Sequence, residues 1–177
     1  MTPASIRALV TGGGGGIGGA IANELLARGA AVLLVDRDEA ALRRAAERLS
    51  RYADRVGTIA ADLTNGVDRK RLCTEAAAWR GGINVLVNNA GVNHFSMFAD
   101  QPPEQLDLAI AINLLAPMHL CRELLPHLQK QPEACILNAG SVFGAIGYPG
   151  YAVYSASKFA VRGFTEALRR ELADTKV

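Results

Sequence analysis

The chain has 177 residues, of which half are hydrophobic and 20% are charged, so it is neither disordered nor collagen-like and has the length of one folded domain. Its 19 lysine and arginine residues nearly balance 17 aspartate and glutamate residues, which excludes the basic surface that nucleic acid or an anionic membrane would attract. No apolar run approaches the roughly 18 residues of a membrane span, and the first residues lack the pattern of a signal peptide. We expect a single cytoplasmic domain over residues 1–177.

The three cysteines are Cys73, Cys121 and Cys135. Their odd number and wide spacing match neither a disulfide framework nor a Cys-x-x-Cys pair, and no set of histidine ligands lies near them. We expect reduced thiols and no metal site.

Apolar runs of strand length alternate with stretches of helical periodicity. In chain order they predict a strand at 6–11, a helix at 17–28, a strand at 31–35, a helix at 38–52 and a strand at 56–60. There follow a helix at 68–79, a strand at 83–87, a loop at 88–100, a helix at 102–129, a strand at 134–138, a glycine-rich loop at 140–150 and a helix at 151–173. We expect Asp38 to cap the second helix, and Pro117 to bend or interrupt the fourth.

Alternation of strands with helices of this length predicts βαβ crossovers, because parallel strands need long right-handed connections. The expected fold is therefore α/β. It is a doubly wound parallel sheet with helices on both faces, known as a Rossmann fold.

Five consecutive glycines, residues 12–16, lie between the first strand and the first helix. By composition alone such a run could be a flexible linker. Between a strand and a helix, however, glycine lets the backbone approach a pyrophosphate, and the helix N-terminus offers free N–H groups to its charge. The G-x-G-x-x-G spacing leaves the register open. It fits two sets of glycines, Gly13, Gly15 and Gly18 or Gly14, Gly16 and Gly19.

Asp36 closes the second strand roughly twenty residues after the loop, where a carboxylate can accept hydrogen bonds from the hydroxyls of an adenosine ribose. This favours NAD over NADP, because a 2′-phosphate beside Asp36 would cost about 1–4 kcal/mol in repulsion between like charges. The glycine loop also lacks a lysine or arginine that could receive the phosphate. Arg37 weighs the other way, since its side chain could turn toward a phosphate. Asp36 could also serve only as a helix cap.

Tyr154 and Lys158 are four residues apart, so on one helix their side chains lie on the same face. A tyrosine normally titrates near pH 10, too high for efficient proton exchange at neutral pH. A shift of about three pKa units takes roughly 4 kcal/mol of preference for the phenolate, and a nearby ammonium and a nicotinium charge could supply much of it. Taken alone, this pair is common in helices and more often marks a buried tyrosine beside a solvated lysine. Tyr148 and Tyr151 have no lysine four residues later.

The chain carries its motifs in one order and at familiar spacings. They are Thr11-Gly12-x-x-x-Gly16-Ile17-Gly18, Asp62-Leu63, Asn88-Asn89-Ala90-Gly91, Asn113, Ser141 and Tyr154-Ser155-Ala156-Ser157-Lys158. Together they resemble the classical short-chain dehydrogenase/reductase family, from about Ile6 to the last residue. The resemblance implies that Gly12, Gly16 and Gly18 set the register of the glycine loop.

The resemblance also implies roles for these residues. Asp62 would hydrogen-bond the adenine, and residues 88–91 would wall the adenosine side, although Asn88 and Asn89 could form only a turn at the strand end. The expected cofactor-binding set is Thr11, Gly12, Gly16, Ile17, Gly18, Asp36, Arg37, Asp62, Leu63, Asn88, Asn89, Ala90, Gly91, Tyr154 and Lys158.

The implied catalytic set is Asn113, Ser141, Tyr154 and Lys158. Ser141 would orient the substrate carbonyl, and Tyr154 would act as general acid and base. Lys158 would lower the pKa of Tyr154 and hold the nicotinamide ribose, and Asn113 would anchor a water that links Lys158 to solvent. Without the resemblance, Ser141 would be a plain loop residue and Asn113 a polar kink in a helix.

The implied reaction is reversible hydride transfer between nicotinamide C4 and a carbinol carbon, which interconverts a secondary alcohol and a ketone with NAD, or less favourably NADP, as cofactor. The alternative is a dinucleotide-binding sensor or subunit without catalysis, which would not need the catalytic set. His94 is a candidate for substrate contact, and Phe95, Phe143 and Tyr148 are candidates for an apolar pocket. All four could equally be ordinary loop residues.

Classical members of the family are usually longer. Relative to them we expect the chain to be incomplete at its C-terminus, lacking the last two strands and the segment that closes over the substrate, with the strand at 134–138 as an edge. The resemblance further implies a homodimer or homotetramer that pairs the helices at 102–129 and 151–173.

Overall fold

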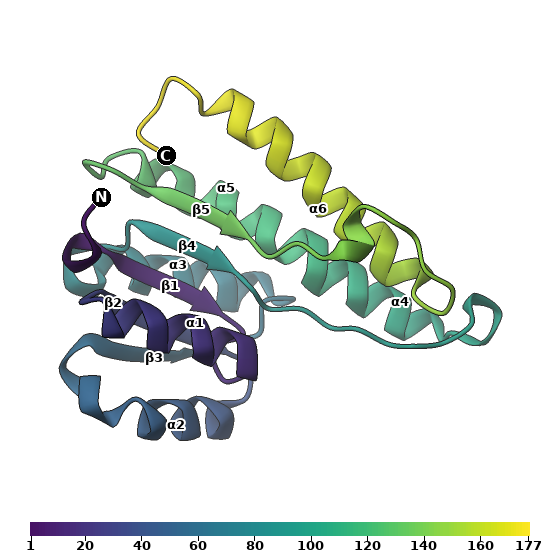
Figure 1. Cartoon of the computed structure of the whole chain (residues 1–177), viewed down its shortest axis with the longest axis horizontal. Helices are drawn as coiled ribbons and strands as arrows, with labels where there is room; N and C mark the ends of the chain where they lie inside the picture. Colours follow the sequence, from purple (N-terminus) through teal and green to yellow (C-terminus); the bar gives the residue numbers. More distant parts are fainter.

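The computed structural model describes residues 1–177, which form one parallel sheet flanked by helices (Figure 1). The strands are β1 (Arg7–Thr11), β2 (Ala31–Asp36), β3 (Val56–Ala60), β4 (Val85–Asn88) and β5 (Cys135–Asn138). The helices are α1 (Gly16–Ala27), α2 (Glu39–Arg48), α3 (Gly66–Ala78), α4 (Pro103–Ile110), α5 (Ala116–Leu128) and α6 (Ala152–Glu171). The predicted elements are all present, and their bounds shift by a few residues.

The strand order is β3-β2-β1-β4-β5, and every neighbouring pair is parallel. The chain runs outward from β1 to β3, then returns to the other side of β1 for β4 and β5. In such a sheet the crevice at the reversal, outside the carboxyl ends of β1 and β4, is the usual place for a ligand. The doubly wound α/β fold expected from the sequence is confirmed, with β5 as an edge strand.

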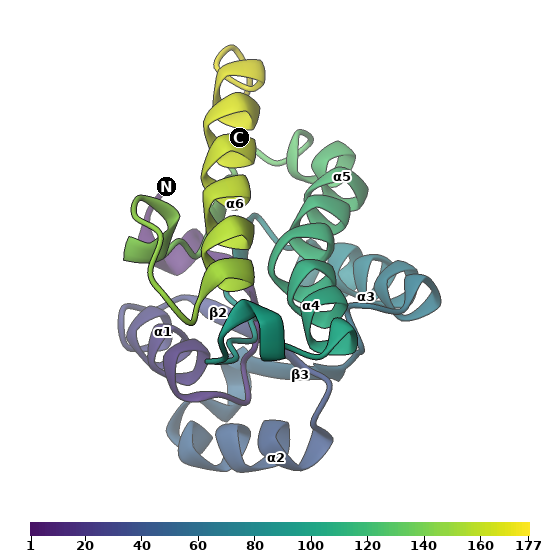
Figure 2. The ribbon, with the colours of Figure 1, turned by 90° about the vertical axis from the view of Figure 1, so that its right-hand side faces the viewer.

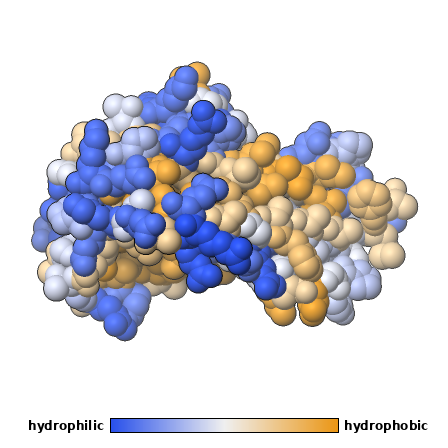
Figure 3. Space-filling model, turned by 90° about the horizontal axis from the view of Figure 1, so that it is seen from above, coloured by the Kyte–Doolittle hydropathy of each residue, from blue (hydrophilic) through white to orange (hydrophobic).

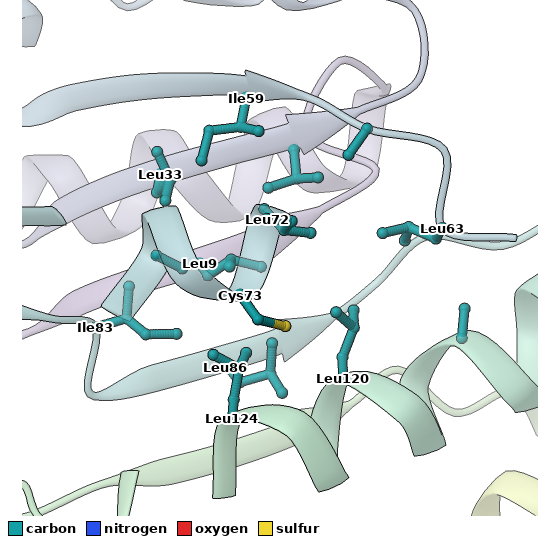
Figure 4. Close-up of a cluster of buried hydrophobic side chains, with 14 of the residues drawn as sticks. Leu9, Leu33, Ile59, Leu63, Leu72, Cys73, Ile83, Leu86, Leu120 and Leu124 are labelled. Atoms are coloured by element: carbon teal, nitrogen blue, oxygen red, sulfur yellow. The ribbon is translucent and has the colours of Figure 1, made fainter. Parts of the chain in front are cut away.

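Alternate residues of the central strands enter two separate cores, because successive side chains of a strand point to opposite faces. On one face Leu9, Leu33 and Leu86 pack with α3 and α5, as the close-up in Figure 4 shows. On the other face Val10 and Leu34 pack with α1 and α2. The two cores hold the carboxyl ends of the strands at one edge of the molecule.

Side-chain caps define the starts of two helices. Asp38 accepts a hydrogen bond from the backbone N–H of Ala41 at 2.9 Å and caps α2, as predicted. Asn65 accepts from the N–H groups of Val67 and Asp68 at 2.8 and 3.2 Å and starts α3 two residues earlier than predicted. The sequence pattern missed this cap because Gly66 and Val67 do not fit the apolar periodicity.

Pro117 neither ends nor breaks the long helix. Instead, a π-helical segment, Ala111–Leu115, joins α4 to α5. Proline has no N–H to donate to the carbonyl of Asn113, and the helix absorbs this by a wider turn, in which the N–H of Ala116 bonds the carbonyl of Ala111. The predicted interruption is therefore a change of helical register.

The helix Pro103–Leu128 is long and apolar enough to cross a membrane by length and composition, contrary to the expectation that no segment is. Its apolar face lies in the core, where Leu120, Leu124 and Leu128 are fully buried. Figure 2 shows α6 beside α4, and α6 also contacts the π-helical segment Ala111–Leu115.

Candidate active site

Two adjoining hollows lie at the carboxyl edge where the strand order reverses. One, of about 300 Å³, follows the glycine loop and the start of α1. The other, of about 210 Å³, lies between the ends of β2 and β3 and the segment after β4. Both are lined by Gly12, Asp36, Ala90 and Gly91. Together they form an elongated site at the sheet's reversal.

The glycine loop has different steric demands at its three motif positions. Gly12 has φ +67°, a conformation that favours glycine. A Cβ at Gly18 would collide with the carbonyl oxygen of Gly12, so α1 can approach the loop only without a side chain there. A Cβ at Gly16 would meet no atom within 4 Å. The protein's own packing therefore does not require glycine at 16, and the space beside the N-terminus of α1 is left open.

Asp36 is held by backbone groups on both of its oxygens. Oδ2 accepts from the N–H of Gly14 at 3.1 Å, and Oδ1 accepts from the N–H of Asp38 at 3.2 Å. These contacts aim the carboxylate at the end of β2 into both hollows. Arg37 lines the smaller hollow, is exposed and makes no hydrogen bond.

Asp62 and Leu63, both expected in the cofactor-binding set, line the smaller hollow. Oδ1 of Asp62 accepts from the N–H and the hydroxyl of Thr64, both at 2.8 Å. Its Oδ2 accepts no hydrogen bond from the protein and is free for a ligand donor. Ile17 lies 72% exposed in the larger hollow, which fits a residue that covers a bound group.

Thr11 and Asn88 were expected to bind cofactor, but neither lines either of these two hollows. The Thr11 hydroxyl accepts from the N–H groups of Asn89 and Ala90, both at 3.0 Å, and so ties the segment after β4 to β1. The Asn88 amide donates to Oδ1 of Asn138 on β5 at 2.8 Å. Both side chains position the wall, and Asn89, Ala90 and Gly91 form it.

Tyr154 and Lys158 lie on the same face of α6. The Lys158 Nζ is 5.8 Å from the centroid of the Tyr154 ring and donates to the carbonyl of Ala139 at 2.8 Å. Lys158 is only 6% exposed, and its burial lowers the pKa of the ammonium. Ala139 is the one acceptor that Nζ contacts, which leaves further ammonium donors to meet other groups at this edge.

Ser141 begins the short 3-10 turn Val142–Gly144 that follows β5, and its Oγ accepts from the N–H of Phe143 at 3.2 Å. Ser141 and Lys158 line one further hollow of about 360 Å³. The turn sits tightly on α6, since a Cβ at Gly144 would lie 2.9 Å from the carbonyl oxygen of Lys158. This close approach brings Ser141 to the face of α6 that carries the tyrosine and the lysine.

Asn113 is buried in the π-helical segment and forms two hydrogen bonds with the backbone of Val92. Its Oδ1 accepts from the N–H at 2.8 Å, and its Nδ2 donates to the carbonyl at 2.9 Å. Its amide also donates to Oγ of Ser157 at 3.2 Å, and that hydroxyl donates to the carbonyl of Tyr154 at 2.7 Å. Ser157 is therefore a positioning residue that the sequence left without a role. Its place in the Tyr-Ser-Ala-Ser-Lys motif was the available signal.

The sheet's reversal carries a glycine loop, and beyond it Lys158 shares a hollow with Ser141 and lies beside the Tyr154 ring, which is the arrangement of a Rossmann-fold oxidoreductase. The short chain dehydrogenase family model matches residues 7–177, and the chain belongs to that family.

Two curated relatives match nearly the whole chain. Nodulation protein G of Rhizobium meliloti (strain 1021) is 38% identical over 171 residues, which cover 97% of this chain and 69% of the relative. The D-beta-hydroxybutyrate dehydrogenase of Cupriavidus necator is 35% identical over 170 residues, which cover 96% of this chain and 66% of the relative.

Solved structures agree with this placement. A short-chain dehydrogenase/reductase from Burkholderia phymatum in complex with NAD superposes with a TM-score of 0.94 at 30% identity, over 100% of this chain and 64% of that one. A metagenomic short-chain oxidoreductase in complex with NADP gives 0.90 at 33% identity, over 98% of this chain and 79% of that one. The chain thus spans less than two thirds of the first of these structures.

Proposed function

We propose that the protein is an NAD-dependent oxidoreductase that interconverts a secondary alcohol and a ketone, with Tyr154 as general acid and base. The observation that carries the proposal is the position of Lys158. Its side chain is buried, its ammonium lies 5.8 Å from the centroid of the Tyr154 ring, and it lines the same hollow as Ser141. A lysine is rarely buried without a task, because desolvation of the ammonium is costly.

Three side chains of the protein take part in the proton transfer or support it. Tyr154 gives its phenolic proton to the substrate oxygen in reduction and takes it back in oxidation. The Lys158 ammonium stabilises the phenolate by its charge, and Ser141 donates a hydrogen bond to the same substrate oxygen. Asn113 and Ser157 hold α6 against the segment after β4, so that the tyrosine keeps its place.

A nicotinamide dinucleotide fits the two hollows at the sheet's reversal. The open space at Gly16 and the free N–H groups of the α1 N-terminus suit a pyrophosphate, and Asp36 suits the ribose of the adenosine. Lys158 would hold the second ribose through its remaining donors. When bound, this cofactor accepts or supplies the hydride.

We propose NAD rather than NADP. The Asp36 carboxylate is oriented by Gly14 and Asp38, so it cannot easily turn away from a 2′-phosphate. Repulsion of about 1–4 kcal/mol would then penalise NADP. Arg37 could offset part of this cost because it is exposed and without a partner.

We also propose a homo-oligomer that pairs the long helices. Leu115 and Met118 on the α4–α5 helix are 44% and 38% exposed, and Phe159 on α6 is 45% exposed. Phe164 and Leu168 instead pack partly against the monomer core. The three exposed side chains give these helices apolar surface for a second copy of the chain.

The test is nucleotide binding and turnover in the full-length protein. NADH should bind more tightly than NADPH in a fluorescence titration, and secondary alcohols should be oxidised in the presence of NAD. Tyr154→Phe should bind NADH as the wild type does but lose turnover by about 10²- to 10⁴-fold, the usual contribution of general acid–base catalysis. Absence of binding of either nucleotide would overturn the proposal, and unchanged turnover in Tyr154→Phe would overturn the role of the tyrosine.

A further inference from the structure

Four aromatic side chains surround the approach to Tyr154. Phe143 and Tyr151 each present an edge to the Tyr154 ring, with centroids 6.3 Å away. Tyr148 stacks on Phe143 at 5.4 Å with an interplanar angle of 12°, and Phe95 lies 5.2 Å from Tyr151. We call these four rings, Phe95, Phe143, Tyr148 and Tyr151, the aromatic wall.

The wall joins two loops that are far apart in the sequence. The N–H of Ser96 donates to the carbonyl of Gly150 at 3.0 Å. Gly150 has φ +81°, and a Cβ there would collide with the ring of Phe95. The ring of Phe95 therefore rests on the bare backbone of Gly150, which holds it in place beside Tyr151.

Much of the wall faces solvent. Phe95 is 69% exposed and Tyr148 is 55% exposed, and the neighbouring Met97, Val142 and Ile146 are exposed too. Figure 3, seen from above, shows apolar surface over the right-hand half of the molecule, toward the end where Figure 1 places these loops. Exposed apolar surface gathered around a proposed catalytic tyrosine is typical of a binding site for an apolar group.

The segments that carry the wall have no charged side chain. Residues 81–99 and 134–157 contain no Asp, Glu, Lys or Arg, and Lys158 directly follows the second of these segments. A substrate carboxylate beside the reacting carbon would contact aromatic rings instead of a cation. The free-energy cost of its desolvation would then not be offset by an ion pair. An uncharged ring would instead find faces and edges to pack against.

We infer that this site selects uncharged alcohols and ketones with an aryl group on the reacting carbon, and that Phe95 is a specificity-determining residue for that group. The inference rests on the proposed function, since it takes the reacting oxygen to lie at Tyr154. Phe143 and Tyr151 are the rings of the wall that pair directly with Tyr154, so we expect them beside a substituent on that carbon. Phe95 extends this surface from the opposite loop.

The experiment compares three alcohols in the full-length protein with NAD, namely 1-phenylethanol, 1-cyclohexylethanol and 3-hydroxybutyrate. Each alcohol loses a hydride to NAD and a proton to the solvent, giving the ketone and NADH. The order of kcat/KM should be phenyl, then cyclohexyl, then the hydroxy acid. Phe95→Leu keeps apolar volume without a ring, so it should lower kcat/KM for the phenyl substrate by roughly 2- to 12-fold, mainly through KM.

Two controls separate recognition from folding. Phe98→Ala removes a ring that is 63% exposed in the 3-10 turn Phe98–Asp100 and belongs to none of the ring pairs of the wall, so it should leave the ratio of phenyl to cyclohexyl kcat/KM unchanged. Saturation-transfer NMR with 1-phenylethanol and the wild-type protein reports binding without turnover, so the inference can be tested even if Phe95→Leu fails to fold.

A preference for 3-hydroxybutyrate, or equal losses for all three alcohols in a folded Phe95→Leu variant, would overturn the inference. So would equal NMR contact of the phenyl and cyclohexyl alcohols. Failure of the proposed function looks different, because neither nucleotide would bind and Tyr154→Phe would change nothing. Nucleotide binding with Tyr154-dependent turnover, but without an aryl preference, would support the proposed oxidoreductase function and overturn only the inferred substrate class.

Discussion

Hydrogen bonds connect the proposed catalytic residues to the segment after β4. Asn113 binds both the N–H and the carbonyl of Val92, and its amide reaches Ser157. Ser157 is fully buried and passes the connection to the carbonyl of Tyr154. These hydrogen bonds connect the segment after β4, the π-helical segment and α6. A substitution of Ser157 should therefore shift the position of Tyr154.

Ser157→Ala removes that hydroxyl and should lower the free energy of unfolding by about 1–3 kcal/mol, because a buried amide donor loses an acceptor. We expect kcat to fall more than the Kd for NADH rises, since Ser157 itself lines neither of the two nucleotide hollows. Ser157→Thr keeps the hydroxyl and should restore kcat. Equal kcat for wild type and Ser157→Ala would show that the connection has no part in positioning Tyr154.

At the scale of elements, the glycines in the turn from β1 to α1 have two different roles: one allows the helix to pack against the loop, and another leaves space for a ligand. Gly18 is required by the approach of α1 to Gly12, whereas Gly16 faces open space. Substitution by alanine should therefore destabilise the fold at Gly18 but not at Gly16. It should weaken nucleotide binding at both.

Gly18→Ala should lower the free energy of unfolding by about 1–3 kcal/mol through overpacking. Gly16→Ala should leave it unchanged or raise it by about 0.5–1 kcal/mol, while NADH binds more weakly because a methyl group enters the space for the pyrophosphate. Gly163→Ala, in open space on α6, is the control that should not alter binding. Thermal unfolding with and without NADH measures both effects, and tight NADH binding by Gly16→Ala would contradict this assignment of the hollow.

The alternation of strands and helices, the Asp38 cap and the edge position of β5 could be predicted from the sequence, because each depends on local periodicity or on chain order. The π-helical segment could not, since its form depends on how Pro117 and the buried Asn113 are accommodated together. The amide of Asn88 turns to Asn138, a partner on another strand that no local pattern reveals. The link through Ser157 was missed for the same reason.

At the scale of the whole molecule, the three free cysteines report on different depths of the fold. Burial raises the pKa of Cys73 to about 12 and that of Cys121 to about 11. Cys135 lies exposed on the edge strand β5, although partial burial of its thiol raises its pKa too. The two buried thiols can react only when the core opens, because the thiolate is the nucleophile.

We therefore expect one thiol to react with a disulfide reagent at neutral pH in the folded protein and all three to react in denaturant. The rate for the first should rise with pH, since thiolate forms as the pH approaches the raised pKa of Cys135. Cys135→Ser identifies the fast thiol. Three equally fast thiols in the folded protein would show that the core is open.

The strand order also has a consequence for how the chain is synthesised. β1 pairs with β2 through Leu9 and Leu33 and with β4 through Leu9 and Leu86, so one side of β1 finds its neighbour early and the other side much later. Because synthesis proceeds from the N-terminus, β1, β2 and β3 leave the ribosome first. The glycine loop and Asp36 at the end of β2 leave it with them. The residues proposed to bind the pyrophosphate and the adenosine ribose are thus synthesised before α6, with its tyrosine and lysine.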